Sequence, residues 1–95
     1  MAELTPHLGL GTGHSFEGVR SMAAGDAVNV DMRGCIKLAL LPGAGATATV
    51  SRVTDTKATA HSTSTVTIPA DNIIPIDWPF YRLSVAGGTL QFACV

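Results

Sequence analysis

The amino-acid sequence predicts a small all-β protein, a β-sandwich of jelly-roll-like or immunoglobulin-like type. Three observations favour this fold class. From residue 28 onward, hydrophobic and polar residues alternate in short segments rich in Ala, Thr, Ser and Val, which is the period of a strand with one buried face. Pro and Gly interrupt these segments at intervals of about 8 to 12 residues, as turns do in small sandwiches. The chain has 95 residues, which is the size of one domain.

The strands can be placed from this alternation and from the turn residues between them. They are expected over residues 28–32, 35–41, 46–53, 62–68, 73–76, 80–85 and 89–95. In the second segment Ile36, Leu38 and Leu40 share one face, which predicts a central strand that lines the core. The segment over 73–76 contains Pro75, which cannot donate to a strand ladder and therefore predicts an edge strand or a loop.

Two of the connections are typical of hairpins. Residues 42–45, Pro-Gly-Ala-Gly, form a strong turn signal between the second and third segments, so these two segments are expected to pair. Residues 86–88, Ala-Gly-Gly, offer the positive φ angles that a tight turn requires between the last two segments. The core faces of this second hairpin are predicted to be Tyr81, Leu83, Val85, Leu90, Phe92 and Cys94.

Residues 1–27 are expected to form an extended, Gly-rich N-terminal arm ahead of a sandwich domain over residues 28–95. The arm contains five glycines and shows no sustained period. A short helix over Phe16–Ala24 is allowed, with Ser15 as its N-cap and Gly25 just past its end, although a glycine inside it opposes this. The N-terminus lacks the regions of a secretory signal, and no stretch approaches the roughly 20 apolar residues of a membrane span.

Composition limits both stability and partners. Hydrophobic residues make up 46% of the chain but aromatic residues only 5%, so much of the apolar content is Ala rather than large core side chains. A domain of this size buries only roughly 60 to 65% of the surface that its unfolded chain exposes, so we expect it to gain stability from neighbouring subunits. The formal net charge of -1 gives no electrostatic footprint for nucleic acid or an anionic membrane, so neither is an expected partner.

No residue pattern predicts an enzyme, a cofactor or a metal site. Residues 9–14 superficially resemble a phosphate-binding glycine loop, but they lack its sixth-position Gly and its Lys-Ser/Thr. The candidate metal ligands match no zinc-site spacing: His7, His14, His61 and Glu17. The candidate carboxylates lie in turn contexts, where Asp is favoured for its backbone hydrogen bonds: Asp55, Asp71 and Asp77. The many Thr hydroxyls have a structural explanation, because Thr suits the solvent face of a strand.

The two cysteines leave two alternatives open. Cys35 and Cys94 both lie in strand-like segments, where a reduced Cys behaves as a small buried hydrophobe. A disulfide between them would close a long loop and contribute about 4 kcal/mol in the chain-entropy model. The missing signal sequence favours a reducing compartment and hence two thiols.

Aromatic residues concentrate at Trp78, Phe80 and Tyr81, and two interpretations compete for them. An exposed Trp-Tyr platform could stack on a sugar ring or anchor an interface. Alternatively, Trp78 and Tyr81 plug the end of a small core. The second interpretation requires no ligand and is the simpler one.

The segment over residues 78–92, Trp-Pro-Phe-Tyr-Arg-Leu-Ser-Val-Ala-Gly-Gly-Thr-Leu-Gln-Phe, resembles the C-terminal hairpins of small β-sandwich virion proteins of tailed bacteriophages. The resemblance extends over residues 34–95 in short strands rich in Ala, Thr and Gly. It implies a capsid decoration or cement subunit, a homotrimer that binds a major capsid protein and reinforces the head. It also implies location in the virion after assembly in the host cytoplasm.

In such proteins extended termini grip neighbouring subunits, which the Gly-rich arm would fit. The interface residues expected from the arm and the aromatic group are Leu8, Leu10, Phe16, Trp78, Phe80 and Tyr81. The alternative function is a carbohydrate- or receptor-binding β-sandwich module, such as a head spike or tail component, in which Trp78 and Tyr81 stack on a sugar.

Overall fold

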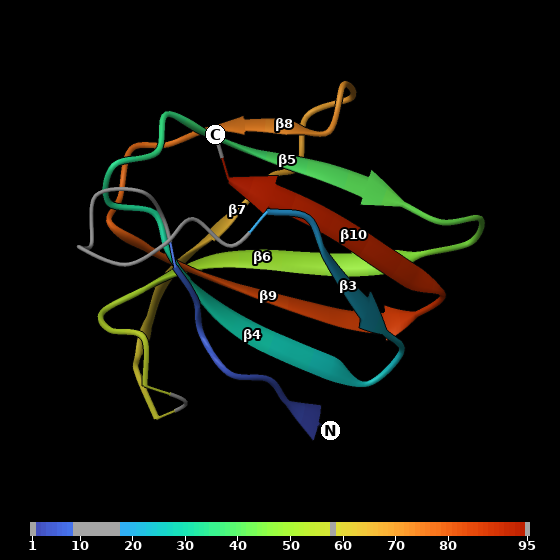
Figure 1. The fold of residues 1–95 in the computed structure, drawn as a ribbon, viewed down its shortest axis with the longest axis horizontal. Helices are drawn as coiled ribbons and strands as arrows, with labels where there is room; N and C mark the ends of the chain where they lie inside the picture. The colour runs from blue at the N-terminus through green and yellow to red at the C-terminus, as the bar shows by residue number, and fades with distance from the viewer. Residues whose placement is uncertain (1, 9–17, 58, 95) are drawn as a thin grey trace.

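The computed structural model describes residues 2–8, 18–57 and 59–94, which form two β-sheets packed face to face (Figure 1). Sheet A contains β1 (Ala2–Glu3), β2 (His7–Leu8), β4 (Asp26–Asp31), β6 (Thr47–Val53), β7 (Ser62–Val66) and β9 (Phe80–Gly87). Sheet B contains β3 (Arg20–Ala23), β5 (Lys37–Pro42), β8 (Ile73–Pro75) and β10 (Thr89–Cys94). The main strands are antiparallel, in the orders β4-β9-β6-β7 and β3-β10-β5-β8. The predicted all-β sandwich is confirmed, and the described residues contain no helix, membrane-spanning or otherwise.

The core lies between the two sheets and is built by alternation along the strands. The inward side chains of β9 and β10 are all buried, as the sequence predicts: Tyr81, Leu83, Val85, Leu90, Phe92 and Cys94. The remaining core side chains come mainly from β3, β4, β5, β6 and β8: Met22, Val28, Val30, Leu38, Leu40, Val50 and Ile74. Burying one such Val, Leu, Ile, Met or Phe stabilises the fold by roughly 1.5–3 kcal/mol.

Both predicted hairpins are wrong in the same way, because each of these turns carries the chain from one sheet to the other. β5 pairs with β10 and β8 in sheet B, whereas β6 pairs with β9 and β7 in sheet A. Likewise β9 lies in sheet A and β10 in sheet B. Gly88 separates these two strands, and its φ of 73° lets the chain leave sheet A. The two strands therefore lie in different sheets instead of side by side.

Three sheet-to-sheet connections gather at one end of the sandwich, on the right in Figure 1: β3 to β4, β5 to β6 and β9 to β10. The amide of Gly43, after β5, donates to the carbonyl oxygen of Thr89 in β10 at 2.9 Å. A Cβ atom at Gly88 would lie 2.7 Å from the Cα atom of Ala46, which precedes β6. The last two connections therefore pack backbone against backbone, with no room for a side chain at position 88.

Two further expectations are wrong near the ends of sheet B. Residues 20–23, the last part of the helix that the sequence allowed, form β3, which pairs with β10; residues 16 and 17 lie outside the described part of the chain. Pairing with a sheet here outweighs a weak helix propensity. Ile36 is 78% exposed instead of buried, because β5 begins only at Lys37 and the residue before it lies in a bend.

The described part of the N-terminal region is held against the chain's own sandwich. β1 and β2 both pair in parallel with β4, at residues 26–27 and 30–31. Asn29 and Asp31, which alternate with the core residues of β4, are also buried. β3 and the first two residues of β4 also precede residue 28, so residues before the expected start of the sandwich take part in both sheets.

The far edges of the two sheets differ. Sheet B ends at β8, a short edge strand that stops at Pro75, so the edge predicted from this proline is confirmed. Sheet A ends at β7, which pairs with β6 alone, and every residue from Ser62 to Thr65 is exposed. β7 is therefore an edge strand whose outer side no other described strand covers.

Candidate functional site

A hydrogen-bonded corner joins the end of β6 to the loop that precedes β9. The guanidinium of Arg52 donates to the carboxylate of Asp77 twice, from Nε to Oδ1 at 3.0 Å and from Nη2 to Oδ2 at 2.9 Å. The hydroxyl of buried Tyr81 donates to Asp77 Oδ1 at 2.6 Å, and the Asp77 amide donates to that hydroxyl at 3.2 Å. Arg52 also donates from Nη1 to Ser64 Oγ at 3.0 Å. Since a bidentate Arg–carboxylate pair fixes both partners in one geometry, this corner ties β6, β7 and β9 together.

These contacts shift the ionisation of both acidic groups. The Arg52 guanidinium, and then the Tyr81 hydroxyl, lowers the pKa of Asp77 to about 2. Burial, and then the hydrogen bond to Asp77, raises the pKa of Tyr81. The carboxylate therefore stays ionised and the phenol stays protonated around neutral pH. A general acid or base needs a pKa near the working pH, so the corner has the properties of a structural ion pair.

We expect Asp77→Asn to flatten the acid side of the stability profile. The pKa of Asp77 is lower in the folded chain than the ordinary 3.8, so its stabilising contribution is complete above about pH 4 and is lost as the pH falls toward about 2. Thermal unfolding midpoints measured across this range should fall more steeply for the unmodified protein than for Asp77→Asn. Asp71→Asn controls for the loss of one surface carboxylate. Equal slopes for the unmodified protein and Asp77→Asn would contradict the role assigned to the pair.

The structure separates the aromatic residues that the sequence groups together. Tyr81 is fully buried, so its ring cannot stack on a ligand. Trp78 is 38% exposed, and its Nε1–H donates to the carbonyl oxygen of Val53 at 2.8 Å, which fastens the loop before β9 to β6. Phe80 is half-buried, with the Cζ atom of Arg33 5.2 Å from its ring centroid. The core interpretation therefore holds for Tyr81, and Trp78 is left as the exposed member of the group.

The arm residues expected at an interface are not placed by the structure: Leu10, Phe16 and the side chain of Leu8 lie outside the described part. Glu3, by contrast, receives two bonds from Arg82, from Nη2 at 2.6 Å and from Nη1 at 2.9 Å. Arg82 Nη1 also donates to Asn29 Oδ1 at 2.7 Å, and the Asn29 side-chain amide donates to the carbonyl oxygen of Lys57 at 2.7 Å. The outer side of sheet A around β4 is thus occupied by the chain's own arm and loop.

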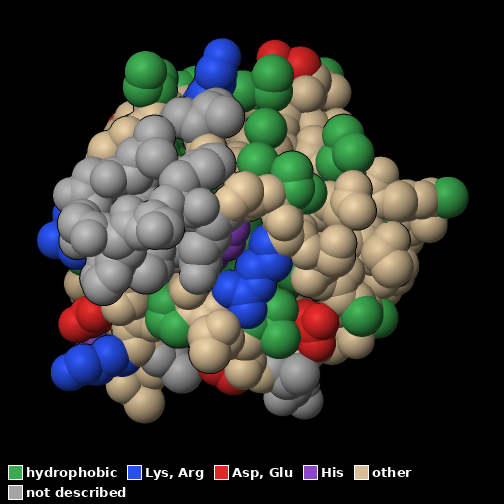
Figure 2. Space-filling model, in the orientation of Figure 1, with side chains coloured by type: hydrophobic (Ala, Val, Ile, Leu, Met, Phe, Trp, Pro, Cys, Tyr) green, Lys and Arg blue, Asp and Glu red, His purple; other side chains and the backbone are tan. Residues whose placement is uncertain are grey.

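The outward side of sheet B, in contrast, is not occupied by another described part of the chain, and much of it is apolar. We call its uncharged part the B face, and it consists of Ser21, Ala23, Ala39, Leu41, Ile73, Gln91 and Ala93. Ala93, Ala39 and Ile73 lie in register across β10, β5 and β8. Leu41 is 68% exposed. Figure 2 shows hydrophobic side chains gathered over β5, β8 and the adjoining part of β10.

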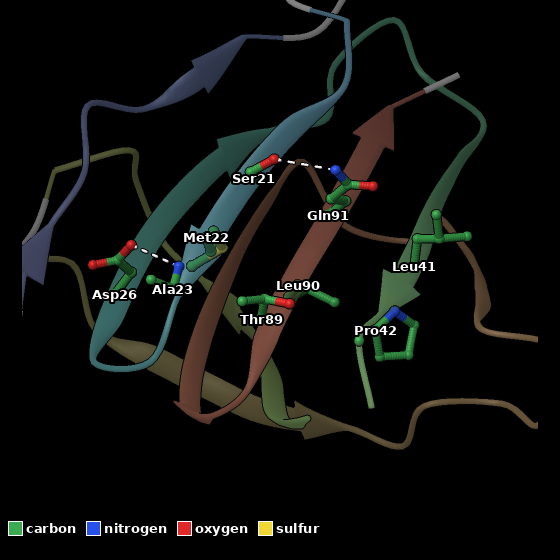
Figure 3. A pocket seen from close by; sticks show the side chains of 10 residues that line it. Ser21, Met22, Ala23, Asp26, Leu41, Pro42, Thr89, Leu90 and Gln91 are labelled. Atoms are coloured by element: carbon green, nitrogen blue, oxygen red, sulfur yellow. Dashed lines mark hydrogen bonds between the residues drawn. The ribbon is translucent and has the colours of Figure 1, made fainter. Parts of the chain in front are cut away.

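Two hollows open on the B face. The larger, of about 640 Å³, lies between β3, β10 and the end of β5 (Figure 3). Its polar groups already bond to one another: Gln91 Nε2 donates to Ser21 Oγ at 3.3 Å, and the Ala23 amide donates to Asp26 Oδ2 at 2.9 Å. The smaller, of about 200 Å³, lies over β5 and β10 and has a mainly apolar lining. Small-molecule sites bring unpaired polar groups together in an apolar cavity, so these hollows fit a protein surface better.

The other candidate residues do not form a site in the described ranges. Within residues 2–8, 18–57 and 59–94, no three His, Cys, Asp or Glu side chains are placed to hold a metal ion. His61 is exposed in the loop before β7, and His7 is buried with its ring edge-on to Phe92 at 4.9 Å between centroids. His14 and Glu17 lie outside the described part. Cys35 and Cys94 are not joined by a disulfide.

Sequence reasoning missed the Arg52–Asp77 pair and the B face. A turn context does account for Asp71, whose Oδ1 accepts a bond from the Ile73 amide at 3.1 Å, but it does not account for Asp77. In the sequence, the one indication of this ion pair was the position of Arg52, because the alternation along β6 predicts that its side chain points inward. For the B face the signal was Leu41, because adjacent Leu40 and Leu41 must point to opposite sides of a strand.

In comparisons with known proteins, no family model, no curated protein and no solved structure matches this chain. Its function is therefore argued from the geometry of its own surfaces.

Proposed function

We propose that this protein is a non-enzymatic structural subunit of a virion, a capsid decoration or cement protein that docks on the shell through the B face. The observation that supports this is the contrast between the two outer sides of the sandwich. Sheet A carries hydroxyl-rich strands, and around β4 it is covered by the chain's own arm. The outward side of sheet B carries Lys37 at the start of β5, and beside it the B face presents Ala, Leu and Ile across three adjacent strands, with no covering segment among the described residues.

The physical reason for docking is the transfer of apolar surface out of water. Burial contributes roughly 25 cal/mol for each Å² of apolar area. Ala39 and Ala93 at the centre of the B face let another backbone or flat surface approach closely, while Leu41 and Ile73 project beside them. A small domain with few aromatic residues has a thin stability margin. Docking would therefore stabilise the subunit and the shell together.

The assignment to a virion rests on the resemblance of residues 78–92 to phage decoration proteins, and it places the protein on a major capsid protein after assembly in the host cytoplasm. The formal net charge of -1 supports a protein partner over nucleic acid. The alternative, a carbohydrate- or receptor-binding module, now depends on Trp78 alone, because Tyr81 is buried. We therefore prefer the docking function.

Leu41→Asp is expected to weaken shell binding at least tenfold. It places an unpaired carboxylate in an apolar contact, and a cost of about 1.4 kcal/mol already gives a factor of ten in Kd. The measurement is co-sedimentation with undecorated shells of the virus that encodes the protein. Thr49→Asp is the matched control, since it adds the same charge to an exposed strand position of sheet A. Unmodified protein that does not sediment with shells would overturn the proposed function, and Leu41→Asp that binds like Thr49→Asp would overturn the role of the B face.

A further inference from the structure

We infer that the open edge of β7 pairs with β7 of a second copy of this chain, antiparallel about a two-fold axis at Thr65. This contact would join the two A sheets into one continuous sheet. The inference does not rest on the proposed function, because it concerns self-association through an edge of sheet A and not docking through the B face.

The other sheet edges are protected against strand addition. The β4 edge of sheet A is covered by β1 and β2. In sheet B, β8 has three residues and ends in Pro75, which has no N–H to donate. β3 has four residues and begins with Arg20, whose guanidinium binds the backbone oxygen of Thr5. Covers, prolines, charges, bulges and short length are the devices by which edge strands avoid pairing with other chains.

β7 carries no proline and no charge, and no other described strand covers it; its one such device is a bulge at Thr63, which has no Cα partner in β6. Its sequence, Ser-Thr-Ser-Thr-Val, contains no charge and no proline. Its register with β6 is regular from Ser64 to Val66, and the irregularity lies only toward Ser62. Arg52, whose side chain binds Ser64 in β7, forms an ion pair with Asp77. An uncharged strand of β-branched and hydroxyl residues with an open row of backbone groups is suited to adding another strand.

The sequence around Thr65 is complementary to itself, which argues for a second copy as the occupant. A two-fold axis at Thr65 places this residue opposite its own copy, with Cβ atoms about 4.5–5.5 Å apart. Within the regular part of β7 it also places Ser64 opposite Val66. Thr–Thr pairs directly across antiparallel strands are favourable, and no like charges meet. Thr65 is exposed, so it is accessible for this pairing.

A contact of one strand's length buries less than the roughly 1,200 Å² of a standard stable interface, so the dimer is expected to be weak and reversible. A two-fold contact also closes with two copies. Self-association through β7 therefore gives a dimer, whereas the resemblance to phage decoration proteins implies a trimer. The molecular mass measured in solution distinguishes a dimer from a trimer.

The test uses opposite charges at the axis. Sedimentation equilibrium at protein concentrations up to about 1 mM is expected to show a monomer–dimer equilibrium for the unmodified protein. Thr65→Lys alone and Thr65→Glu alone should each be monomeric, because identical charges then face each other. An equimolar mixture of the two should again form dimers, since opposite charges meet at the axis. Thr49→Lys, on the neighbouring strand β6, should dimerise like the unmodified protein.

Three results would each overturn the inference. They are an unmodified protein that stays monomeric to the highest concentration, a trimer in place of the dimer, and a Thr65→Lys and Thr65→Glu mixture that remains monomeric. Circular dichroism confirms that each variant is folded, which exposed positions should permit. Shell binding is measured separately with Leu41→Asp, so failure of either idea leaves the other standing.

Discussion

Gly88→Ala should cost the protein roughly 2–5 kcal/mol of its free energy of unfolding. Two penalties combine at this position. Gly88 has a φ of 73°, which strains any residue with a Cβ by about 1–2 kcal/mol. The new Cβ would also lie 2.7 Å from the Cα atom and 3.0 Å from the amide nitrogen of Ala46, and overpacking of this kind typically costs about 1–3 kcal/mol. Neither neighbour is a side chain that can turn away.

Gly45→Ala is the matched control for this prediction. Gly45 has a φ of 72°, but nothing lies within 4 Å of the position its Cβ would take. Gly45→Ala should therefore lower the free energy of unfolding only by the cost of the strained backbone conformation, about 1–2 kcal/mol. Urea unfolding curves for the two variants measure the difference directly. Equal losses would mean that the connections from β5 to β6 and from β9 to β10 do not pack against each other as described.

Phe92→Ala should be the most destabilising single truncation in the core, at about 3–5 kcal/mol. The side chain is 1% exposed, lies between the sheets, and meets the edge of the His7 ring. Removing it leaves a cavity that two sheets tied by crossovers cannot easily close. For a domain of this length the total stability is about 5–14 kcal/mol, so the variant should lose at least about a fifth of it and unfold at a markedly lower temperature.

Leu41→Ala tests the opposite side of the same sheet. Leu41 is 68% exposed on the B face, and its truncation should change the free energy of unfolding by no more than about 0.5 kcal/mol. Differential scanning calorimetry should show a much lower midpoint for Phe92→Ala and a nearly unchanged one for Leu41→Ala. A large loss in Leu41→Ala would show that this side chain is buried within the subunit, which would remove the exposed apolar patch from the docking argument.

Alternation predicts which side of a strand is buried, and it does so well here. The inward positions of β9 and β10, from Tyr81 to Cys94, follow from their period-2 pattern. The same pattern carries no information on which strand lies alongside. A Gly-rich turn between two strands serves equally for a hairpin and for a connection between sheets, which is why residues 42–45 and 86–88 are misassigned from the sequence.

The candidate surfaces were less predictable because they depend on distant parts of the chain. Arg52 and Asp77 are 25 residues apart, and nothing local indicates that they meet. The exposure of Leu41 follows from alternation, but that it shares an uncovered face with Ile73 follows only from the pairing of β5 with β8. The open edge of β7 likewise depends on sheet order.

The alternation of successive strands between sheets also affects how this chain folds. Among the described strands, β6 and β7 are the only consecutive pair that hydrogen-bond to each other. Every other pairing joins residues at least 23 positions apart, and the separation reaches 72 between Arg20 in β3 and Phe92 in β10. The entropy of loop closure is lost before such contacts can form. Folding is therefore expected on the millisecond-to-second scale of β-sandwiches, with unpaired strands exposed for longer than in a protein built from hairpins.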